Sequence, residues 1–143
     1  MKITVYDPAV SSVSVPGITL KPWPEGIEEC DFIIFTCSLN KNNLHMFNRA
    51  VIEKCKPGIR VVNVARGQLI NESDLCNALE SGKIHSAALD VFETEPLPDN
   101  SKLRTHPLCV LGSHNSSNTF EAVMRTNKRA IDYLLNFLGI LEL

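Results

Sequence analysis

The sequence lacks an excess of charge of one sign and any long apolar run. Its 14 lysines and arginines are interspersed with 16 aspartates and glutamates, which gives a net charge of −2 and no basic stripe. Nucleic acids and anionic membranes attract proteins through such a stripe, so neither partner is expected. No apolar run approaches the roughly 18 residues of a membrane span, and no charged-then-apolar leader precedes the first expected strand. We therefore expect a cytoplasmic protein.

The sequence also lacks the cysteine and histidine spacings of disulfide frameworks and metal sites. Its five cysteines are odd in number and form no C-x-x-C pair. Its four histidines show no ligand spacing with one another or with carboxylates. We expect reduced thiols, most of them in the core, and no bound metal.

Glycine is scarce as well, and its seven copies include no G-x-G-x-x-G cluster. Such a cluster binds the phosphates of a dinucleotide through backbone amides at a helix N-terminus. Its absence conflicts with the opening residues, MKITVYDPAV, which look like the second strand of a dinucleotide-binding fold. In such a fold a carboxylate at the strand end, here Asp7, holds a ribose, although Asp7 could equally cap a turn.

Short β-prone runs alternate with helical patterns along the chain. Strands are expected at residues 3–6, 18–20, 31–37, 60–65, 86–91 and 109–113. Helices are expected at residues 25–30, 42–55 and 71–82, and from Asn118 onward, where an apolar stripe runs from Ala122 to Leu138. Continuous apolar runs such as DFIIFTC, at 31–37, are typical of strands buried on both faces. The alternation predicts an α/β fold, with a Rossmann-like parallel sheet and helices on both faces, in one domain spanning residues 1–143.

Three side chains with complementary chemistry follow predicted buried strands. Arg66 follows VVNVA, Glu95 follows SAALDV and His114 follows CVLGS. The carboxyl ends of parallel strands meet at one edge of a sheet, so these side chains could converge. Arg66 could clamp and polarise an α-keto or α-hydroxy acid, and His114 could exchange a proton with it near neutral pH. Glu95 could fix the tautomer of the imidazole and favour its protonated form.

Each of these residues also has a simpler interpretation. Arg66 could be a surface ion-pair partner, and Glu95 a solvated loop charge to which Glu93 is an equally placed alternative. His114 could be a turn residue, and His106 competes for the acid–base role. A serine hydrolase is disfavoured, because no G-x-S-x-G turn is present and the serine adjacent to His114 is badly placed for it.

Two long segments resemble a known family. They read VVNVARGQLINESDLCNALESGKIHSAALDVFETEPLP and HPLCVLGSHNSSNTFEAV, and the likeness extends over almost the whole chain. They are similar to the signature of the D-isomer-specific 2-hydroxyacid dehydrogenases, which include D-lactate, phosphoglycerate, glyoxylate-reducing and formate dehydrogenases. The resemblance implies an NAD-dependent oxidoreductase that moves hydride between nicotinamide and a small 2-hydroxy or 2-keto acid.

The resemblance also implies residue roles. Arg66 binds the substrate, Glu95 is the carboxylate partner, and His114 is the acid/base that protonates the substrate oxygen while hydride reaches the carbon. Asp90 receives the nicotinamide carboxamide, and Asp7 binds the adenosine ribose hydroxyls, which favours NAD over NADP. The other residues expected at the cofactor are Cys37, Ser38, Val64, Ala65 and Asn115.

The chain departs from the family in three places. GSHNSS surrounds His114 where a T-P-H motif is usual, and TCSL at residues 36–39 replaces H-x-P-L. The first strand, the glycine-rich turn and its helix, and the substrate domain are missing from the sequence. We therefore expect a partial dinucleotide-binding domain, a piece of a longer enzyme that is inactive on its own.

The missing strand has a structural consequence. In the family's order it lies between ITVYD and DFIIFTC, so its loss exposes the edge of the latter. Either ITVYD fills the slot, or a second copy supplies a strand in a swapped homodimer. A second hypothesis remains for function, namely a non-catalytic NAD-binding or dimerisation module.

Overall fold

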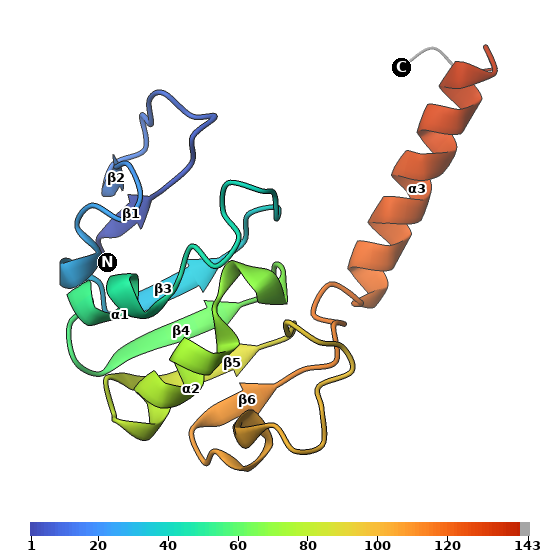
Figure 1. Cartoon of the computed structure of the whole chain (residues 1–143). Coiled ribbons are helices and arrows are strands. Elements are labelled where there is room, and N and C mark those ends of the chain that lie inside the picture. The colour runs from blue at the N-terminus through green and yellow to red at the C-terminus, as the bar shows by residue number, and fades with distance from the viewer. Residues whose placement is uncertain (141–143) are drawn as a thin grey trace.

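The structure is a computed structural model that describes residues 1–140 (Figure 1). Its strands are β1 (Ile3–Val5), β2 (Ile18–Leu20), β3 (Phe32–Phe35), β4 (Ile59–Asn63), β5 (Ile84–Leu89) and β6 (Cys109–Leu111). Its α-helices are α1 (Arg49–Lys54), α2 (Glu72–Glu80) and α3 (Phe120–Phe137). Three short 3₁₀ helices lie at Ile27–Glu29, Gly67–Leu69 and Lys102–Thr105.

The main sheet has four parallel strands in the order β3-β4-β5-β6. Val61 in β4 pairs with Ile33 of β3 on one side and with Ala87 of β5 on the other. Parallel neighbours that follow one another in sequence require crossover connections, and α1 and α2 lie in two of them. The predicted Rossmann-like α/β fold is confirmed.

The first strand does not join this sheet. β1 pairs in parallel with β2, with Ile3 opposite Ile18, and the two form a separate sheet. The prediction that the ITVYD segment could slide beside β3 is therefore wrong. The hydrogen-bonding groups of β1 are used by β2 instead, and β3 is left as the outermost strand of the main sheet.

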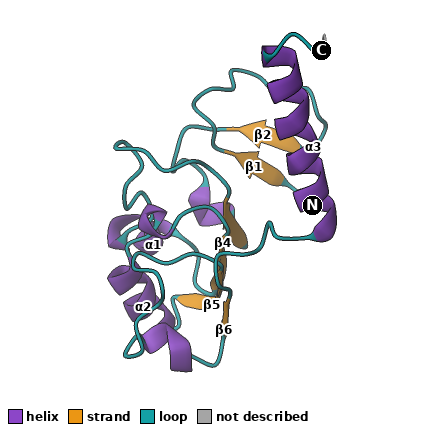
Figure 2. Ribbon diagram, turned by 90° about the vertical axis from the view of Figure 1, so that its right-hand side faces the viewer, coloured by secondary structure: helices purple, strands orange, loops and turns teal. Residues whose placement is uncertain are grey.

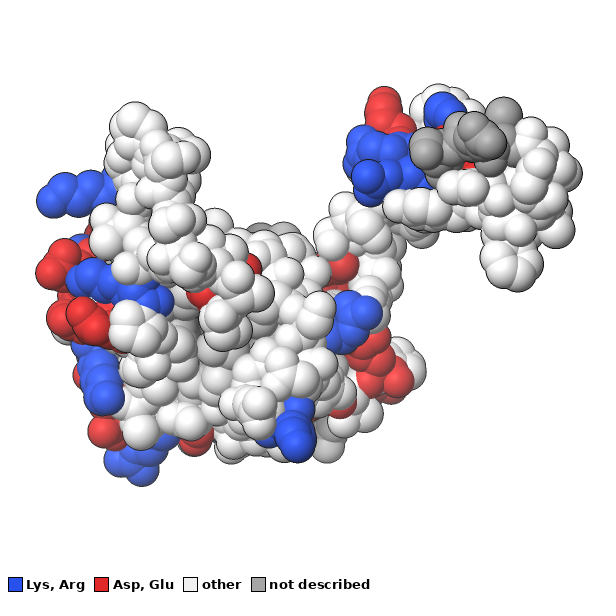
Figure 3. All heavy atoms as spheres, turned by 90° about the horizontal axis from the view of Figure 1, so that it is seen from above, with Lys and Arg blue, Asp and Glu red and all other residues white. Residues whose placement is uncertain are grey.

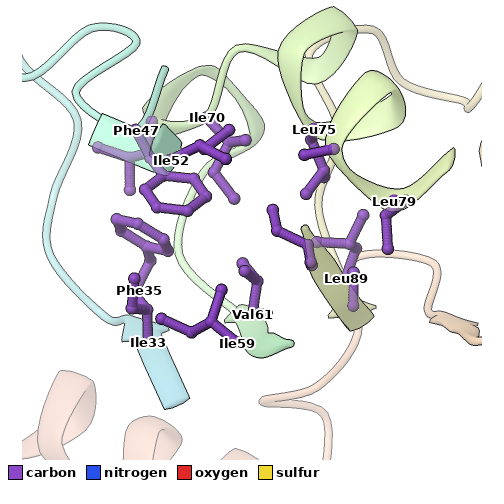
Figure 4. Packing of buried hydrophobic residues seen from close by; sticks show 14 of the residues in the cluster. Ile33, Phe35, Phe47, Ile52, Ile59, Val61, Ile70, Leu75, Leu79 and Leu89 are labelled. Atoms are coloured by element: carbon purple, nitrogen blue, oxygen red, sulfur yellow. The ribbon is translucent and has the colours of Figure 1, made fainter. Parts of the chain in front are cut away.

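The core lies on one face of the main sheet only. Alternate residues of β3 and β4, such as Phe35 and Val61, point into it and pack against α1 and α2, as Figure 4 shows. Figure 2 shows both helices on the same side of the strands. On the opposite face Phe32, Ile34 and Val110 are 57%, 60% and 71% exposed. The expectations of a β3 strand buried on both faces and of helices on both faces are not met within residues 1–140.

Two helices begin where local caps place them. Asn71 caps α2 as predicted, since its side chain accepts a hydrogen bond from Asp74 N at 3.0 Å. The helix predicted over 42–55 is shorter: Phe47 forms a parallel bridge with Ile70, and Asn48 then caps α1. Residues 41–45 form turns, because the preceding loop must reach this bridge.

The N-cap of the terminal helix lies one residue later than predicted, and the helix extends from the body of the molecule (Figure 1). Thr119, rather than Asn118, accepts the capping bond from Ala122 N, and Asn118 N donates to Asn115 O in the preceding turn. The predicted apolar stripe is present in sequence, but no residue of α3 is buried. Ile131 and Leu134 are more than half exposed.

Surface charge is mixed on the face shown in Figure 3, where lysines and arginines lie beside aspartates and glutamates. None of the helices within residues 1–140 is both long enough and apolar enough to cross a membrane. The five cysteines are free thiols, of which Cys55 is buried and Cys37 is exposed.

Candidate active site

The loops that follow β4, β5 and β6 carry the three predicted catalytic residues. Arg66 is the third residue after β4, Glu95 the sixth after β5 and His114 the third after β6. These strands are adjacent and parallel, so their carboxyl ends lie side by side (Figure 1). The sheet therefore delivers the three loops to one edge, which is where parallel α/β sheets bind ligands.

The structure pairs two of the three side chains. Glu95 Oε2 lies 2.8 Å from His114 Nδ1, with the side chains 35% and 47% exposed. The other carboxylate oxygen, Oε1, accepts a hydrogen bond from Phe92 N at 3.0 Å. The carboxylate thus has a fixed direction, and it selects the imidazole tautomer that carries its proton on Nδ1. Nε2 has no protein partner among the described residues and is the nitrogen available for proton exchange.

Electrostatics support this pairing. The hydrogen bond with His114 lowers the pKa of the Glu95 carboxyl, and the amide of Phe92 lowers it further, against a smaller opposing effect of burial. A carboxylate ionised in this way remains charged near neutral pH and accepts the hydrogen bond from Nδ1 of His114. The pair therefore has the geometry of an acid–base group with a supporting carboxylate.

Asp90 holds the segment around His114. Its carboxylate accepts hydrogen bonds from Asn115 N at 3.1 Å and Ser116 N at 2.9 Å, and its carbonyl accepts one from His114 N at 2.8 Å. Burial raises the pKa of the Asp90 carboxyl, but the bonds from Ser116 and Asn115 outweigh that effect and the net pKa lies below the ordinary value. His114 has a φ of 59°, a left-handed conformation that these bonds stabilise.

Arg66 lies at the same edge but is not paired with Glu95 or His114 within the described residues. Its guanidinium instead donates to the carbonyl of Ala65. Its neighbour Gly67 packs directly on the Glu95 loop, because a Cβ built at Gly67 would lie 1.9 Å from the carbonyl carbon of Phe92. The backbone of Arg66 is therefore fixed against the loop that carries Glu95, while its exposed side chain is free to turn toward a ligand.

Asn63 is a structural residue of the site that sequence analysis missed. It is 1% exposed, its Nδ2 donates to Arg66 O at 2.8 Å, and its Oδ1 accepts from Ala65 N at 3.1 Å. The signal was present in the sequence: an asparagine within the apolar run VVNVA is a buried polar group that needs partners. These bonds shape the turn from which Arg66 projects.

The residues predicted at the cofactor are spread over several loops. Asp7 accepts a bond from Ala9 N at 2.9 Å, so it does cap a turn, and this leaves the role at a ribose open. Cys37 is exposed, and Asn43 Nδ2 donates to Ser38 O at 2.8 Å. Val64 is exposed and Ala65 is buried.

The two residues that competed for the acid–base roles have other partners. His106 Nδ1 accepts a bond from Leu108 N at 3.3 Å, which is a turn role. Glu93 Oε1 lies 2.7 Å from His45 Nε2. Neither contacts the Glu95–His114 pair within residues 1–140.

Comparison with known proteins decides the family. The sequence model of the D-isomer specific 2-hydroxyacid dehydrogenase NAD-binding domain matches residues 1–116. The chain belongs to this family. The family is defined by a domain that binds NAD, so the cofactor implied by the sequence resemblance is confirmed for the family.

Individual members of this dehydrogenase family agree in sequence and in fold. D-3-phosphoglycerate dehydrogenase of Bacillus subtilis is 36% identical over 139 residues, which cover 96% of this chain and 26% of that protein. Hydroxypyruvate reductase of Thermotoga maritima is 36% identical over 142 residues, which cover 98% of this chain and 46% of that protein. The structure of D-2-hydroxyisocaproate dehydrogenase superposes with a TM-score of 0.86 at 26% identity, covering 96% of this chain and 46% of the other. The chain thus spans about a quarter to a half of the length of these relatives.

Proposed function

We propose that these residues form a partial dinucleotide-binding domain, spanning residues 1–143, of an NAD-dependent D-2-hydroxyacid dehydrogenase. The proposed reaction moves a hydride between nicotinamide and a small 2-hydroxy or 2-keto acid. The observation that carries the proposal is the 2.8 Å contact between Glu95 and His114, on adjoining loops at the carboxyl edge of the sheet. A dehydrogenase of this kind needs such a proton donor beside the substrate oxygen.

Each side chain has a distinct task in the proposed reaction. His114 donates a proton from Nε2 to the substrate oxygen during reduction and removes it during oxidation. Glu95 holds Nδ1 and balances the charge of the imidazolium. Arg66 turns from the Ala65 carbonyl to bind the substrate carboxylate through its planar fork of donors. Bound NAD supplies or accepts the hydride.

The chain fits one end of the cofactor better than the other. Asp90 uses one lone pair on each carboxylate oxygen for the Asn115 and Ser116 amides, so acceptor capacity remains for a carboxamide N–H. Asp7 is proposed at the adenosine ribose, and the remaining contacts are proposed for Cys37, Ser38, Val64, Ala65 and Asn115. No residue of this chain is proposed at the phosphates, because these 143 residues contain no G-x-G-x-x-G turn.

A chimera with a longer relative tests the proposal. In the hydroxypyruvate reductase of Thermotoga maritima, the segment matched by this chain is replaced by residues 1–143. We expect this chimera to oxidise NADH with hydroxypyruvate, whereas the 143-residue chain alone gives no turnover with keto acids and binds NADH weakly or not at all. A folded chimera that binds NADH without any turnover would favour the second candidate, a non-catalytic NAD-binding or dimerisation module.

We also propose that the chain forms a homodimer through β3. The outer edge of β3 has no partner strand within residues 1–140, and exposed edges of this kind pair readily with another chain. Sedimentation velocity at rising concentration is expected to show a dimer, and a monomer at all concentrations contradicts this. The free thiols are consistent with the cytoplasmic location that we propose.

A further inference from the structure

Glu93 is bonded through its backbone and its side chain at the same time. Its N–H donates to Glu72 Oε2 at 3.2 Å, and its carbonyl accepts from Gln68 Nε2 at 3.1 Å. Its Oε1 accepts from Glu72 N at 3.1 Å and lies 2.7 Å from His45 Nε2. A loop residue whose amide, carbonyl and one carboxylate oxygen are all engaged in this way is a fixed point of the structure.

These partners come from different loops of the same sheet edge. His45 lies between β3 and α1, Gln68 lies after β4, and Glu93 lies after β5. Glu93 therefore connects the loops that follow three neighbouring strands. Arg66 is two residues before Gln68, and Glu95 is two residues after Glu93, so the connection is made beside both predicted catalytic loops.

His45 is itself held in an uncommon conformation. Its φ is 49°, its N–H donates to Gln68 O at 2.8 Å, and its carbonyl accepts from Asn48 Nδ2 at 3.0 Å. Non-glycine residues adopt a left-handed backbone when surrounding bonds maintain it, and such residues cluster at functional sites. The side chain of His45 is thereby directed to Glu93.

A purely local role for Glu93 would be to cap α2. The amide of Glu72 is the first of that helix, and Glu93 Oε1 accepts from it. However, Asn71 already caps α2, and neither the His45 contact nor the Gln68 bond to the Glu93 carbonyl serves the helix end. These two contacts join the loop of Glu93 to the loops that follow β3 and β4.

We propose that Glu93, held by His45, is a positioning residue that fixes the loop of Glu95 and thereby sets the contact between Glu95 and His114. This inference rests on the proposed function for its catalytic meaning. The effect of Glu93 on the Glu95–His114 pair can be measured without any enzymatic turnover.

The direction in which the pKa of Glu95 changes when Glu93 is replaced distinguishes a positioning role of Glu93 from a purely electrostatic one. Removing a nearby negative charge lowers the pKa of a carboxyl group, because the remaining carboxylate is less repelled. Loosening the loop raises the pKa of Glu95, because the bonds from His114 and from Phe92 N that lower it are weakened. We therefore expect Glu93→Ala to raise the pKa of Glu95 measurably, followed by ¹³C NMR titration of the glutamate-labelled full chain.

Matched variants make the result specific. Glu93→Gln keeps an acceptor for Glu72 N but removes the charge, so the pKa of Glu95 is expected to stay unchanged or to fall slightly, whereas His45→Ala raises it in the same direction as Glu93→Ala. Glu80→Ala removes a carboxylate that pairs with Lys102 at 2.7 Å, outside this network, and is expected to have no effect. If Glu93→Ala does not fold, His45→Ala provides the same measurement with fewer bonds removed.

An unchanged or lowered pKa of Glu95 in the folded Glu93→Ala or His45→Ala chain overturns the inference, even if thermal stability falls. That outcome leaves the proposed function intact when the chimera is active. Conversely, an inactive chimera with the expected change in pKa refutes the function and leaves the positioning role standing.

Discussion

Replacing His114 with asparagine in the active chimera is expected to lower kcat for hydroxypyruvate reduction by about 10²- to 10⁴-fold. The change removes the Nε2 proton donor, while the asparagine amide still offers a polar group to Glu95. KM for NADH is expected to change little, because the proposed role of His114 is proton transfer rather than cofactor binding. Stopped-flow or steady-state loss of NADH absorbance measures both parameters.

His106→Asn is the matched control for this loss. His106 was the other candidate acid, and its ring accepts a bond from Leu108 N in a turn away from the Glu95–His114 pair. Its variant is expected to keep kcat within about twofold. A large loss for His106→Asn together with an unaffected His114→Asn would reverse the assignment of the acid.

Replacing Gly67 with alanine is expected to destabilise the chain by about 3 kcal/mol. A Cβ at this position would lie 1.9 Å from Phe92 C, 2.0 Å from Phe92 O and 2.4 Å from Glu93 N. All three atoms are backbone, so no flexible side chain can move aside. The loops of Arg66 and Glu95 must separate, and urea unfolding followed by circular dichroism measures the loss.

Gly82→Ala is the control that distinguishes the steric clash at Gly67 from the general stability cost of replacing a glycine. Gly82 follows α2 with a φ of 74°, and a Cβ there meets nothing within 4 Å. Its replacement is expected to cost about 1 kcal/mol through backbone strain alone. If Gly67→Ala costs no more than Gly82→Ala, the close approach of the two loops is not present in solution.

Local signals in the sequence were sufficient for much of the fold. The alternation of β-prone and helical segments predicted the parallel sheet, and Asn71 predicted the start of α2, because these features depend on residues that are near in sequence. The Glu95–His114 contact also followed, since parallel strands must bring their carboxyl ends together. The motifs that resemble the dehydrogenase family then identified which glutamate and which histidine to choose.

Features that depend on distant contacts were not predictable in this way. DFIIFTC is apolar on both faces, yet only the face of β3 that meets α1 and α2 is buried, and Phe32 and Ile34 on the other face are exposed within residues 1–140. β1 pairs with β2 and not with β3, and the residues of β1 alone do not specify which strand it pairs with. Apart from the family resemblance, Glu93 and Glu95 were equally placed after β5, and the structure gives them different partners, His45 and His114.

The proposed acid–base site depends on a preformed carboxylate–imidazole pair, and the titration of Glu95 in the full chain tests this pair most directly. We predict a pKa below the ordinary value of a glutamate carboxyl, about 4.3, and a rise toward that value when His114 is replaced by asparagine. The Glu95 carboxylate that accepts the His114 bond is then present above the lowered pKa and is lost as the pH falls through it. A Glu95 pKa at the ordinary value in both proteins would show that the pair does not form, and the proposed acid–base site would have to be abandoned.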